Sequence, residues 1–491
     1  MKPVDRLKII HEVTRSLFSS TNEHEETPRR DNHQYFVYLR VSSWRKNANS
    51  YTIKLTLIGL LLCCSLWGNG LFCRQAFALI GDSEQEFGLD GSLRTLFFLL
   101  NLGKTVPLSG EHNLDALSQT ILRLTAVGKP TKSLSYEIHL VESDTFSTER
   151  ISGGSSLAFG STNTGNVYRY RALDANWNFV QQDQTLCTLV FDRFNVKQAF
   201  DWGDITTGRQ AITFGKTYFW NPLDVFFPFG ASQFDRDYKP GVDALRVDIP
   251  FGRFSGVNLV GSAGPTIKIA PGQQTGNYPQ DATWYGSALM GRLFANMSGW
   301  DFSLQAGKIF GGYQVGGGAV GDVGPIQIRT ELAQFVAMPS DPLPAPLTGD
   351  LVKGNFQGVV GFGHRFENSL SLDFEYFYNG MGDPNSLNAA LVRSQFGSSL
   401  QLSRNLVGLS AQYQITPLVV GQLGTIASLS DWSIQFQPLT TISLSNEMEL
   451  LIGAIIGFGP KPKISTGLAL NIESEFGTLP NTLFFEWKWY F

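Results

Sequence analysis

The sequence predicts an all-β fold, a transmembrane antiparallel up-and-down β-barrel, from three observations. Charged residues make up only 16% of the 491 residues, against about 25% in an average globular chain. Apolar and polar side chains alternate with a period of two along many segments. Beyond residue 78, no apolar run approaches the roughly 20 residues that a membrane-spanning helix needs, and the mean hydropathy is −0.05.

The composition also excludes several classes of protein. With 43% hydrophobic residues and 37 Phe, the chain does not have the charge-rich, aromatic-poor composition of a disordered protein. Four Cys are too few for a scaffold built on disulfides.

The first 78 residues have the pattern of a leader that precedes an exported domain. Residues 1–50 are polar, and the apolar run LTLIGLLLCCSLW follows Lys54. Ala76, Phe77 and Ala78 then form an A-x-A site, so we expect a signal peptide over 51–78 and a barrel over 79–491. The leader lies deep in the chain, and a start at a codon other than AUG, at Val41, would leave most of the extension 1–50 untranslated.

The charge of the exported part argues against nucleic acid as a partner. The leader holds 11 of the 38 basic and 6 of the 42 acidic residues. The chain from 79 to 491 therefore has 27 basic and 36 acidic residues, a net charge of −9.

Alternating segments predict the strands of the barrel. In 432–444 one face is mainly aromatic and aliphatic and includes Thr440, and the other carries Ser, Gln and Thr441, with only Leu439 out of place. A soluble β-sandwich alternates as well, but the polar faces here are small or amide-rich, and the apolar faces end in Tyr, Trp or Phe. Similar alternation occurs in 134–140, 301–306, 370–379 and 407–415.

Short turns and long loops follow one another along the chain, which is typical of a membrane barrel. At about 25 residues for a strand with its connections, 413 residues predict about 16 strands, within a range of 14 to 18. Short turns are expected at 128–132, 250–253, 367–369 and 445–447, and long loops near 143–165, 264–284, 338–353 and 380–398.

The last strand carries a recognisable pattern. Phe485, Trp487, Trp489 and Phe491 share one face, and the chain ends at Phe491. This resembles the terminal strand of bacterial outer-membrane proteins, where the segment is recognised by the barrel-assembly machinery. The resemblance implies a location in the bacterial outer membrane, with its lipid and that machinery as partners.

A second segment, 186–250, is similar to one that recurs in large, largely uncharacterised Gram-negative porin-like barrels. It contains Asp192-Arg193-Phe194, Gly208-Arg209-Gln210, Asn221-Pro222-Leu223-Asp224 and a run from Asp235 to Arg246. The resemblance implies a porin-like barrel, with a more distant likeness to polysaccharide-exporting ones, and covers about a seventh of the chain.

The charges of this segment are candidates for a pore constriction. Arg209, Arg246 and Asp248 alternate with apolar neighbours, so we expect their side chains to point into the lumen. A loop between the strands could fold inward. The alternative is that these charges form structural ion pairs in the barrel wall. Asp192 would face lipid unless it lies at the interface or at a bulge. The candidate lining residues are Arg193, Arg209, Asp235, Arg236, Asp237, Lys239, Arg246, Asp248, Asp373 and Glu375, together with Asp224.

No catalytic or metal motif is found, and we expect neither an enzyme nor a cofactor. Ser135, Glu137 and His139 share one face, which leaves a hydrolase open, but a lumen His is usually a satisfied polar residue. Asp373 and Glu375 lie two residues apart in a polar lumen and need no catalytic role. Gly316, Gly317 and Gly318 do not open a helix, so we expect a loop or a tight position in the barrel.

The sequence thus predicts an outer-membrane porin-like channel for passive diffusion of small solutes, with a weak cation preference from the net charge. Two alternatives stay open. One is a plugged barrel that acts as an adhesin, receptor or scaffold, suggested by lumen-facing Phe377, Leu439 and Leu451. The other is a substrate-specific channel for an anionic saccharide, suggested by Arg193 and Arg209. A homotrimer is compatible with this size of barrel.

Overall fold

A computed structural model describes residues 80–81, 86–101, 114–148, 169–265, 281–340, 349–350, 352–395, 401–464 and 470–491. The predicted polar extension (1–50) and signal peptide (51–78) lie outside the described residues.

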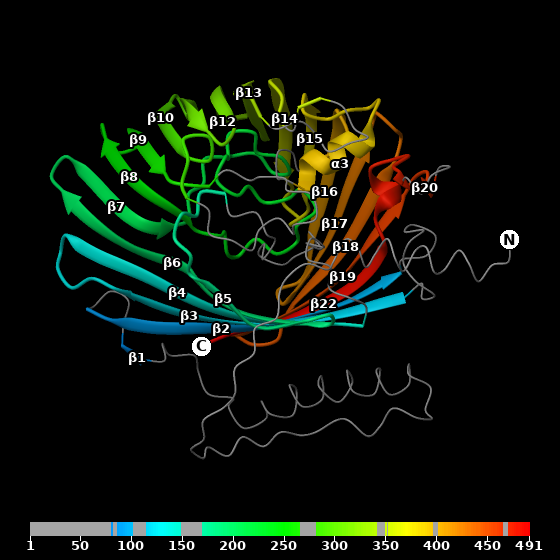
Figure 1. Cartoon of the computed structure of the whole chain (residues 1–491), viewed down its shortest axis with the longest axis horizontal. Helices are drawn as coiled ribbons and strands as arrows, with labels where there is room; N and C mark the ends of the chain where they lie inside the picture. The colour runs from blue at the N-terminus through cyan, green and yellow to red at the C-terminus, as the bar shows by residue number, and fades with distance from the viewer. Residues whose placement is uncertain are drawn as a thin grey trace, which may run out of the picture. The chain divides into compact units, whose positions relative to one another are not determined.

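The described strands form a closed antiparallel barrel (Figure 1). The main sheet has 20 strands, and all of them except β1 (Ile80–Gly81) and β5 (Asn176–Gln182) form a ring of 18, which the pairing of β2 with β22 closes. The ring consists of β2 (Gly88–Asn101), β3 (Leu114–Gly128), β4 (Leu134–Ser147), β6 (Thr185–Phe200), β7 (Gly203–Gln210), β8 (Val242–Pro250), β9 (Ser255–Ser262), β10 (Ala288–Met297), β11 (Trp300–Ile309), β12 (Gly312–Val323), β13 (Ile326–Ala337), β14 (Asn355–Arg365), β15 (Ser371–Asn379), β16 (Asn405–Thr416), β17 (Val419–Ser428), β18 (Ile434–Ser443), β19 (Met448–Phe458) and β22 (Asn481–Tyr490).

The predicted number of about 16 strands was too low, and 18 is the upper end of the expected range. The difference arises where connections are shortest. Strands β10 to β13 follow one another through the two-residue turns 298–299, 310–311 and 324–325. Each strand there uses far fewer than 25 residues with its connection, so more strands fit in the chain.

The connections divide the barrel into two ends. Between β3 and β4, β6 and β7, β8 and β9, β14 and β15, and β18 and β19, the connections have five residues or fewer, and we call this the short-turn end. The longer connections, which follow β7, β9, β13, β15 and β19, leave these strands at the opposite end, and we call it the long-loop end. It also carries the helix α3 (Leu387–Gln395), the 3₁₀ turn η2 (Phe476–Thr478) and the hairpin of β20 (Lys463–Ile464) with β21 (Leu470–Asn471).

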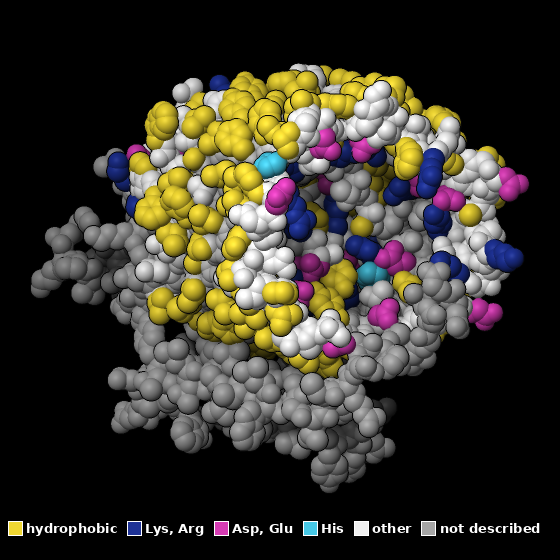
Figure 2. Space-filling model, turned by 180° about the vertical axis from the view of Figure 1, so that it is seen from behind, with side chains coloured by type: hydrophobic (Ala, Val, Ile, Leu, Met, Phe, Trp, Pro, Cys, Tyr) yellow, Lys and Arg dark blue, Asp and Glu magenta, His cyan; other side chains and the backbone are white. Residues whose placement is uncertain are grey.

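The predicted alternation of side chains gives the barrel wall an apolar outer face and a polar inner face. On β11, Leu304 is 63% exposed on the outside of the barrel, whereas its neighbour Gln305 is 3% exposed on the inside. Figure 2 shows hydrophobic side chains over the outer wall, and Lys, Arg, Asp and Glu side chains gathered in the hollow of the barrel. In the described part of the chain, no helix has both the length and the hydropathy to cross a membrane.

The C-terminal strand has the two faces that its sequence predicts. Glu486 and Lys488 are buried on the inner face. On the outer face, the Trp487 and Trp489 rings lie 6.4 Å apart and the Trp489 and Phe491 rings 4.8 Å apart. Aromatic side chains in such a row suit the interface between lipid and water.

Candidate pore constriction

The segment 211–241 between β7 and β8 runs inside the ring, and we call it the inner loop (Figure 1). Two carboxylates of the wall hold its backbone. Glu375 on β15 accepts hydrogen bonds from the N–H groups of Tyr218 (2.5 Å) and Phe219 (2.8 Å). Glu331 on β13 accepts them from Lys216 (2.5 Å) and Leu223 (3.1 Å). Charge-assisted hydrogen bonds of this kind are strong, so they fix the first half of the loop against the wall.

Amide side chains of other strands hold the loop from further around the ring. Gln305 on β11 donates to the Leu223 carbonyl (2.8 Å), and Gln314 on β12 donates to the Pro222 carbonyl (3.1 Å). On β18, Gln437 donates to the Ser232 carbonyl (3.0 Å), and Ser232 donates to Gln435 (3.1 Å). The inner loop is therefore fastened on several sides of the lumen.

The second half of the loop contacts the strands that close the ring. Asp235 forms ion pairs with Arg94 on β2 and with Lys488 on β22, the latter at 3.2 Å. Asp237 lies 2.6 Å from Lys488 and accepts a hydrogen bond from the Tyr490 hydroxyl (3.0 Å). The Phe234 ring stacks on that of Phe484, with centroids 4.1 Å apart.

Three apolar clusters surround the inner loop, and each contains side chains of the loop itself. Phe214 and Phe226 belong to the cluster beside β8 to β13. Phe219 and Trp220 belong to a second cluster, with Phe377 and Phe476, and Phe234 packs against a third, beside β2, β19 and β22. Apolar packing therefore joins the inner loop to the wall in three places.

The glycines of β12 make room for this packing. A Cβ atom at Gly316 would lie 2.6 Å from Leu223 Cδ2, and one at Gly318 would lie 3.2 Å from Leu223 Cδ1. Gly316–Gly318 is part of a strand, at a tight position against the inner loop rather than in a turn. Glycine at these positions lets the Leu223 side chain approach the wall.

Most of the predicted lining charges have partners in the structure. Arg209 is 1% exposed, lies 2.6 Å from Asp243 and donates to the Phe191 and Leu173 carbonyls. The strand β7 ends at Gln210, so the parity that directed Arg209 to the lumen does not continue into the loop. Arg209 therefore lies in the wall within a buried ion pair.

A second buried pair joins the two arms of the inner loop. Lys239 Nζ lies 2.5 Å from Asp224 Oδ2. Burial raises the pKa of Asp224 and lowers the pKa of Lys239, while each partner's charge acts in the opposite direction. Arg236 donates to the Tyr218 and Gln233 carbonyls and thus also holds the loop to itself.

The remaining candidates lie in ion pairs that are open to solvent to different degrees. Arg246 and Asp248 are 2.8 Å apart on β8 and are partly exposed. Asp373 on β15 pairs with Arg329 on β13. Arg193 on β6 pairs with Glu137 at 2.8 Å. The structure therefore brings together the Asp235 and Asp237 pair with β22, but it does not gather all ten candidates in one ring.

His139 has no free ring nitrogen. Arg123 donates to Nδ1 (3.0 Å), so Nε2 carries the proton that points to Glu137 (2.8 Å). A general base needs an unprotonated nitrogen beside the nucleophile, and this arrangement uses both nitrogens for structure. Among the described residues, no group of three or more His, Cys, Asp and Glu is arranged to hold a metal ion.

Asp192 lies at a bulge, which was one of the two expected explanations. The β4–β6 pairing shifts between His139, opposite Arg193, and Leu140, opposite Phe191. The extra residue, Asp192, points inward and accepts hydrogen bonds from Arg123 (3.0 Å) and Arg171 (2.9 Å).

Sequence reasoning missed several anchors of the loop: Arg94, Glu331, Glu486 and Lys488. Their parity was the available signal, because each is a charged residue on the inner face of a strand. Glu486 and Lys488 alternate with the aromatic residues of the last strand, but their connection to the loop could not be read from one strand.

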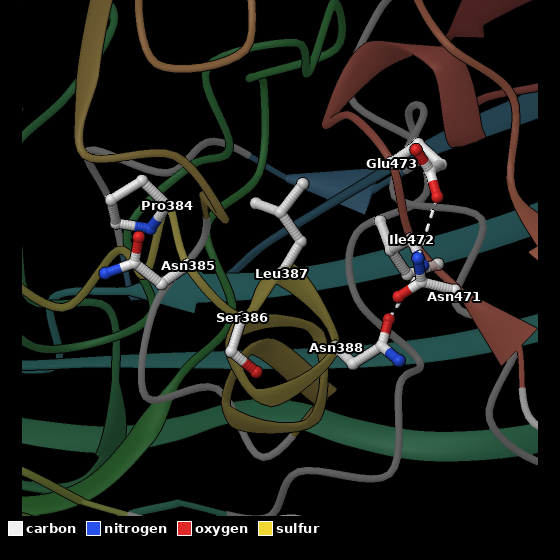
Figure 3. A pocket seen from close by; sticks show the side chains of 8 residues that line it. All are labelled: Pro384, Asn385, Ser386, Leu387, Asn388, Asn471, Ile472 and Glu473. Atoms are coloured by element: carbon white, nitrogen blue, oxygen red, sulfur yellow. Dashed lines mark hydrogen bonds between the residues drawn. The ribbon is translucent and has the colours of Figure 1, made fainter.

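A small pocket of about 280 Å³ lies at the long-loop end, between the start of α3 and the strand β21 (Figure 3). The backbone N–H of Ile472 donates to Asn388 (2.8 Å), and Asn471 donates to Glu473 (2.7 Å). Leu387 and Ile472 line it and belong to one apolar cluster. The polar groups of this pocket mainly join two loops.

Comparisons with known proteins give similarity of structure only. No family model matches the chain, and no curated protein matches its sequence. The solved structures similar to it include Acinetobacter baumannii OccAB2 (TM-score 0.49, 7% identity, 84% of this chain and 99% of that chain) and Pseudomonas aeruginosa OccK5 (0.46, 9%, 84% and 100%). A mutant of the Rh. blastica porin is also similar (0.40, 10%, 82% and 100%). The chain is a closed antiparallel β-barrel, similar to barrels of the porin type.

Proposed function

We propose that the chain is a porin-like channel of the bacterial outer membrane, through which small solutes diffuse passively past the inner loop. The observation that carries the proposal is the loop itself. It lies inside a closed ring with an apolar outer wall and is fastened to β2, β13, β15, β18 and β22. A loop held in this way narrows the lumen at a fixed level.

The loop also sets the size of solute that we expect to pass. Three apolar clusters surround it, whereas the partly exposed charged pair Arg246–Asp248 lies in the barrel wall, and Lys216 of the loop pairs with Asp301 on β11. The passage combines a wet charged region with a narrow part beside the loop. We expect a conductance well below that of an unobstructed 18-stranded barrel.

Selectivity for ions is expected to be weak. The net charge of −9 favours cations, but acids and bases alternate in the wall, as in Arg329–Asp373 and Arg193–Glu137. Neighbouring opposite charges cancel each other's field over a short distance. A small cation preference, and no preference for one substrate, follow from this balance.

Location and partners follow from the wall and the last strand. Outer-membrane lipid would contact the apolar outer face, and the barrel-assembly machinery would recognise Phe485, Trp487, Trp489 and Phe491. The channel would assemble as a monomer or as a homotrimer.

One observation favours the second candidate, a plugged barrel that acts as an adhesin, receptor or scaffold. Phe377 and Leu451 are buried, and Leu439 packs against the cluster that contains Phe98 and Phe484. If this packing leaves no continuous water path, the barrel conducts nothing.

Single-channel conductance of the refolded chain from residue 79, in a planar bilayer, tests the proposal. It is compared with a variant in which a short Gly-Ser linker replaces 217–230, so that the contacts of residues 234–238 with β2 and β22 are kept. We expect small ohmic steps from the chain and larger steps from the variant, with a slightly cation-selective reversal potential in a salt gradient. Migration of unheated samples in SDS gels confirms that both barrels are folded.

Steps from the variant alone would favour the plugged barrel. If neither folded barrel conducts ions, the chain is not a channel. A reversal potential that favours anions would turn attention to Arg193 and Arg246 and to an anionic solute.

A further inference from the structure

The region where the barrel closes is held from inside by the middle of the chain. The first and last strands of the ring, β2 and β22, pair over ten residues, from Ser92–Tyr490 to Asn101–Asn481. On their inner faces lie Arg94, Glu486 and Lys488, which are 2%, 0% and 3% exposed. These three side chains contain two bases and one acid.

The inner loop adds two carboxylates, those of Asp235 and Asp237, to this set. Arg94 lies 2.9 Å from Glu486, and Asp235 pairs with both Arg94 and Lys488. Asp237 lies 2.6 Å from Lys488 and 3.5 Å from Arg94. Without the loop, Lys488 would keep only Glu486, at 3.9 Å. A buried base that loses its partner is strongly destabilising, so the two strands need the loop.

Apolar contacts reinforce these ion pairs. Phe234 stacks on Phe484 of β22 and lies 6.5 Å, centroid to centroid, from Phe98 of β2. Tyr238 lies against the guanidinium of Arg123 on β3, 4.1 Å from the ring centroid. Residues 234–238 thus touch β2, β3 and β22 from the inside.

We propose that residues 234–238, which we call the latch, bind to β2 and β22 only when these two strands have paired, and that they then keep the strands paired. The charged residues of this contact are Arg94, Asp235, Asp237, Glu486 and Lys488. The loop is then a fixed part of the closed barrel, because swinging it outward would leave buried Arg94 and Lys488 without Asp235 and Asp237. This inference does not depend on whether the barrel conducts.

Hydrogen exchange of the backbone amides tests the latch in the whole refolded chain. Asp235→Asn should raise exchange in β2 and β22 at least tenfold relative to the native chain and leave β14 and β15 unchanged. Asp248→Asn is the control, because it removes a carboxylate whose partners, Arg246 and Asn258, lie on β8 and β9 and not on β2 or β22. It should leave exchange in β2 and β22 unchanged.

A double-mutant comparison gives a second measurement. Asp237→Asn and Lys488→Gln should each lower the temperature at which the barrel unfolds in SDS gels, by on the order of 5 °C. The double variant should lose clearly less than the sum, because both changes remove the same pair. Uniform exchange along the barrel in Asp235→Asn, or additive losses in the double variant, would overturn the latch.

Discussion

The ring of Phe491, the last residue, occupies the space that a side chain at Gly91 would need. A Cβ atom at Gly91 would lie 2.3 Å from Phe491 Cε2, and the two residues exchange backbone hydrogen bonds of 2.6 and 2.9 Å. Glycine at position 91 therefore fixes where the C-terminal aromatic row ends.

Gly91→Ala should displace the Phe491 ring and destabilise the barrel by about 1–3 kcal/mol, the usual cost of overpacking. The unfolding temperature in SDS gels measures the effect. Gly291→Ala is the control, since a Cβ there meets Leu259 only at 3.5 Å, an ordinary contact. Equal stability of the two variants would show that the ring can move freely.

Leu223→Ala should cost about 2–5 kcal/mol, as for other fully buried leucines. The side chain fills the space above Gly316 and Gly318, and its loss leaves a cavity between the inner loop and β12. Denaturant unfolding measures the cost. Leu304→Ala, on the exposed outer wall, should cost clearly less, and a similar loss in both variants would speak against the cavity.

Glu375→Gln should loosen the first half of the inner loop. The amide keeps one oxygen acceptor where the carboxylate has two, so either the Tyr218 or the Phe219 N–H loses its partner. A charged hydrogen bond contributes about 1.5–3 kcal/mol. If the barrel conducts, single-channel recordings should show larger or noisier steps, and unchanged records with unchanged stability would contradict the anchoring role.

Arg209→Gln should lower stability by about 3–5 kcal/mol without changing the reversal potential, because it breaks a buried pair away from the pore. Asp243 would then be left without its guanidinium partner. Arg246→Gln, at a partly exposed site, should shift the reversal potential toward cations. A shift for Arg209→Gln of the same size would place Arg209 in the path of ions.

Stability should fall as the pH rises through about 7 because of Glu475, which lies in the loop between β19 and β22. Burial raises the pKa of Glu475 from 4.5 to about 7. The protonated form is favoured in the folded state, so its contribution is complete below pH 4.5 and is lost as the pH rises through 7. In Glu475→Gln, the free energy of unfolding should depend less on pH between pH 5 and 8. An unchanged pH dependence would exclude Glu475 as its cause.

The alternation of side chains predicts much of the fold because it depends only on neighbours along one strand. Glu486 and Lys488 face the lumen, and Phe485 and Trp487 face outward, as the period of two requires. The number of strands was harder to predict. The turn at 310–311 is buried and apolar at Phe310, so it lacks the polar signal of a surface turn.

The sequence predicts which charged residues lie near the candidate constriction, but not which strand residues they pair with. The run from Asp235 to Lys239 was placed in a loop that could turn inward. Its partner Lys488 is 253 residues away from Asp235, and no local pattern links them. Arg209 forms a buried ion pair with Asp243, the arrangement that the sequence left open as the alternative, and the alternation used to orient it stops where β7 ends one residue later.

The pairing of β2 with β22 also means that the ring has no structural beginning. At the short-turn end β2 begins and β22 ends, so a linker between them could close the chain into a circle, and new termini could be opened at 366–370. In such a permuted chain β2 and β22 would be neighbours in sequence. The inner loop would then contact an ordinary hairpin, and the first and last strands of the new chain would be β15 and β14.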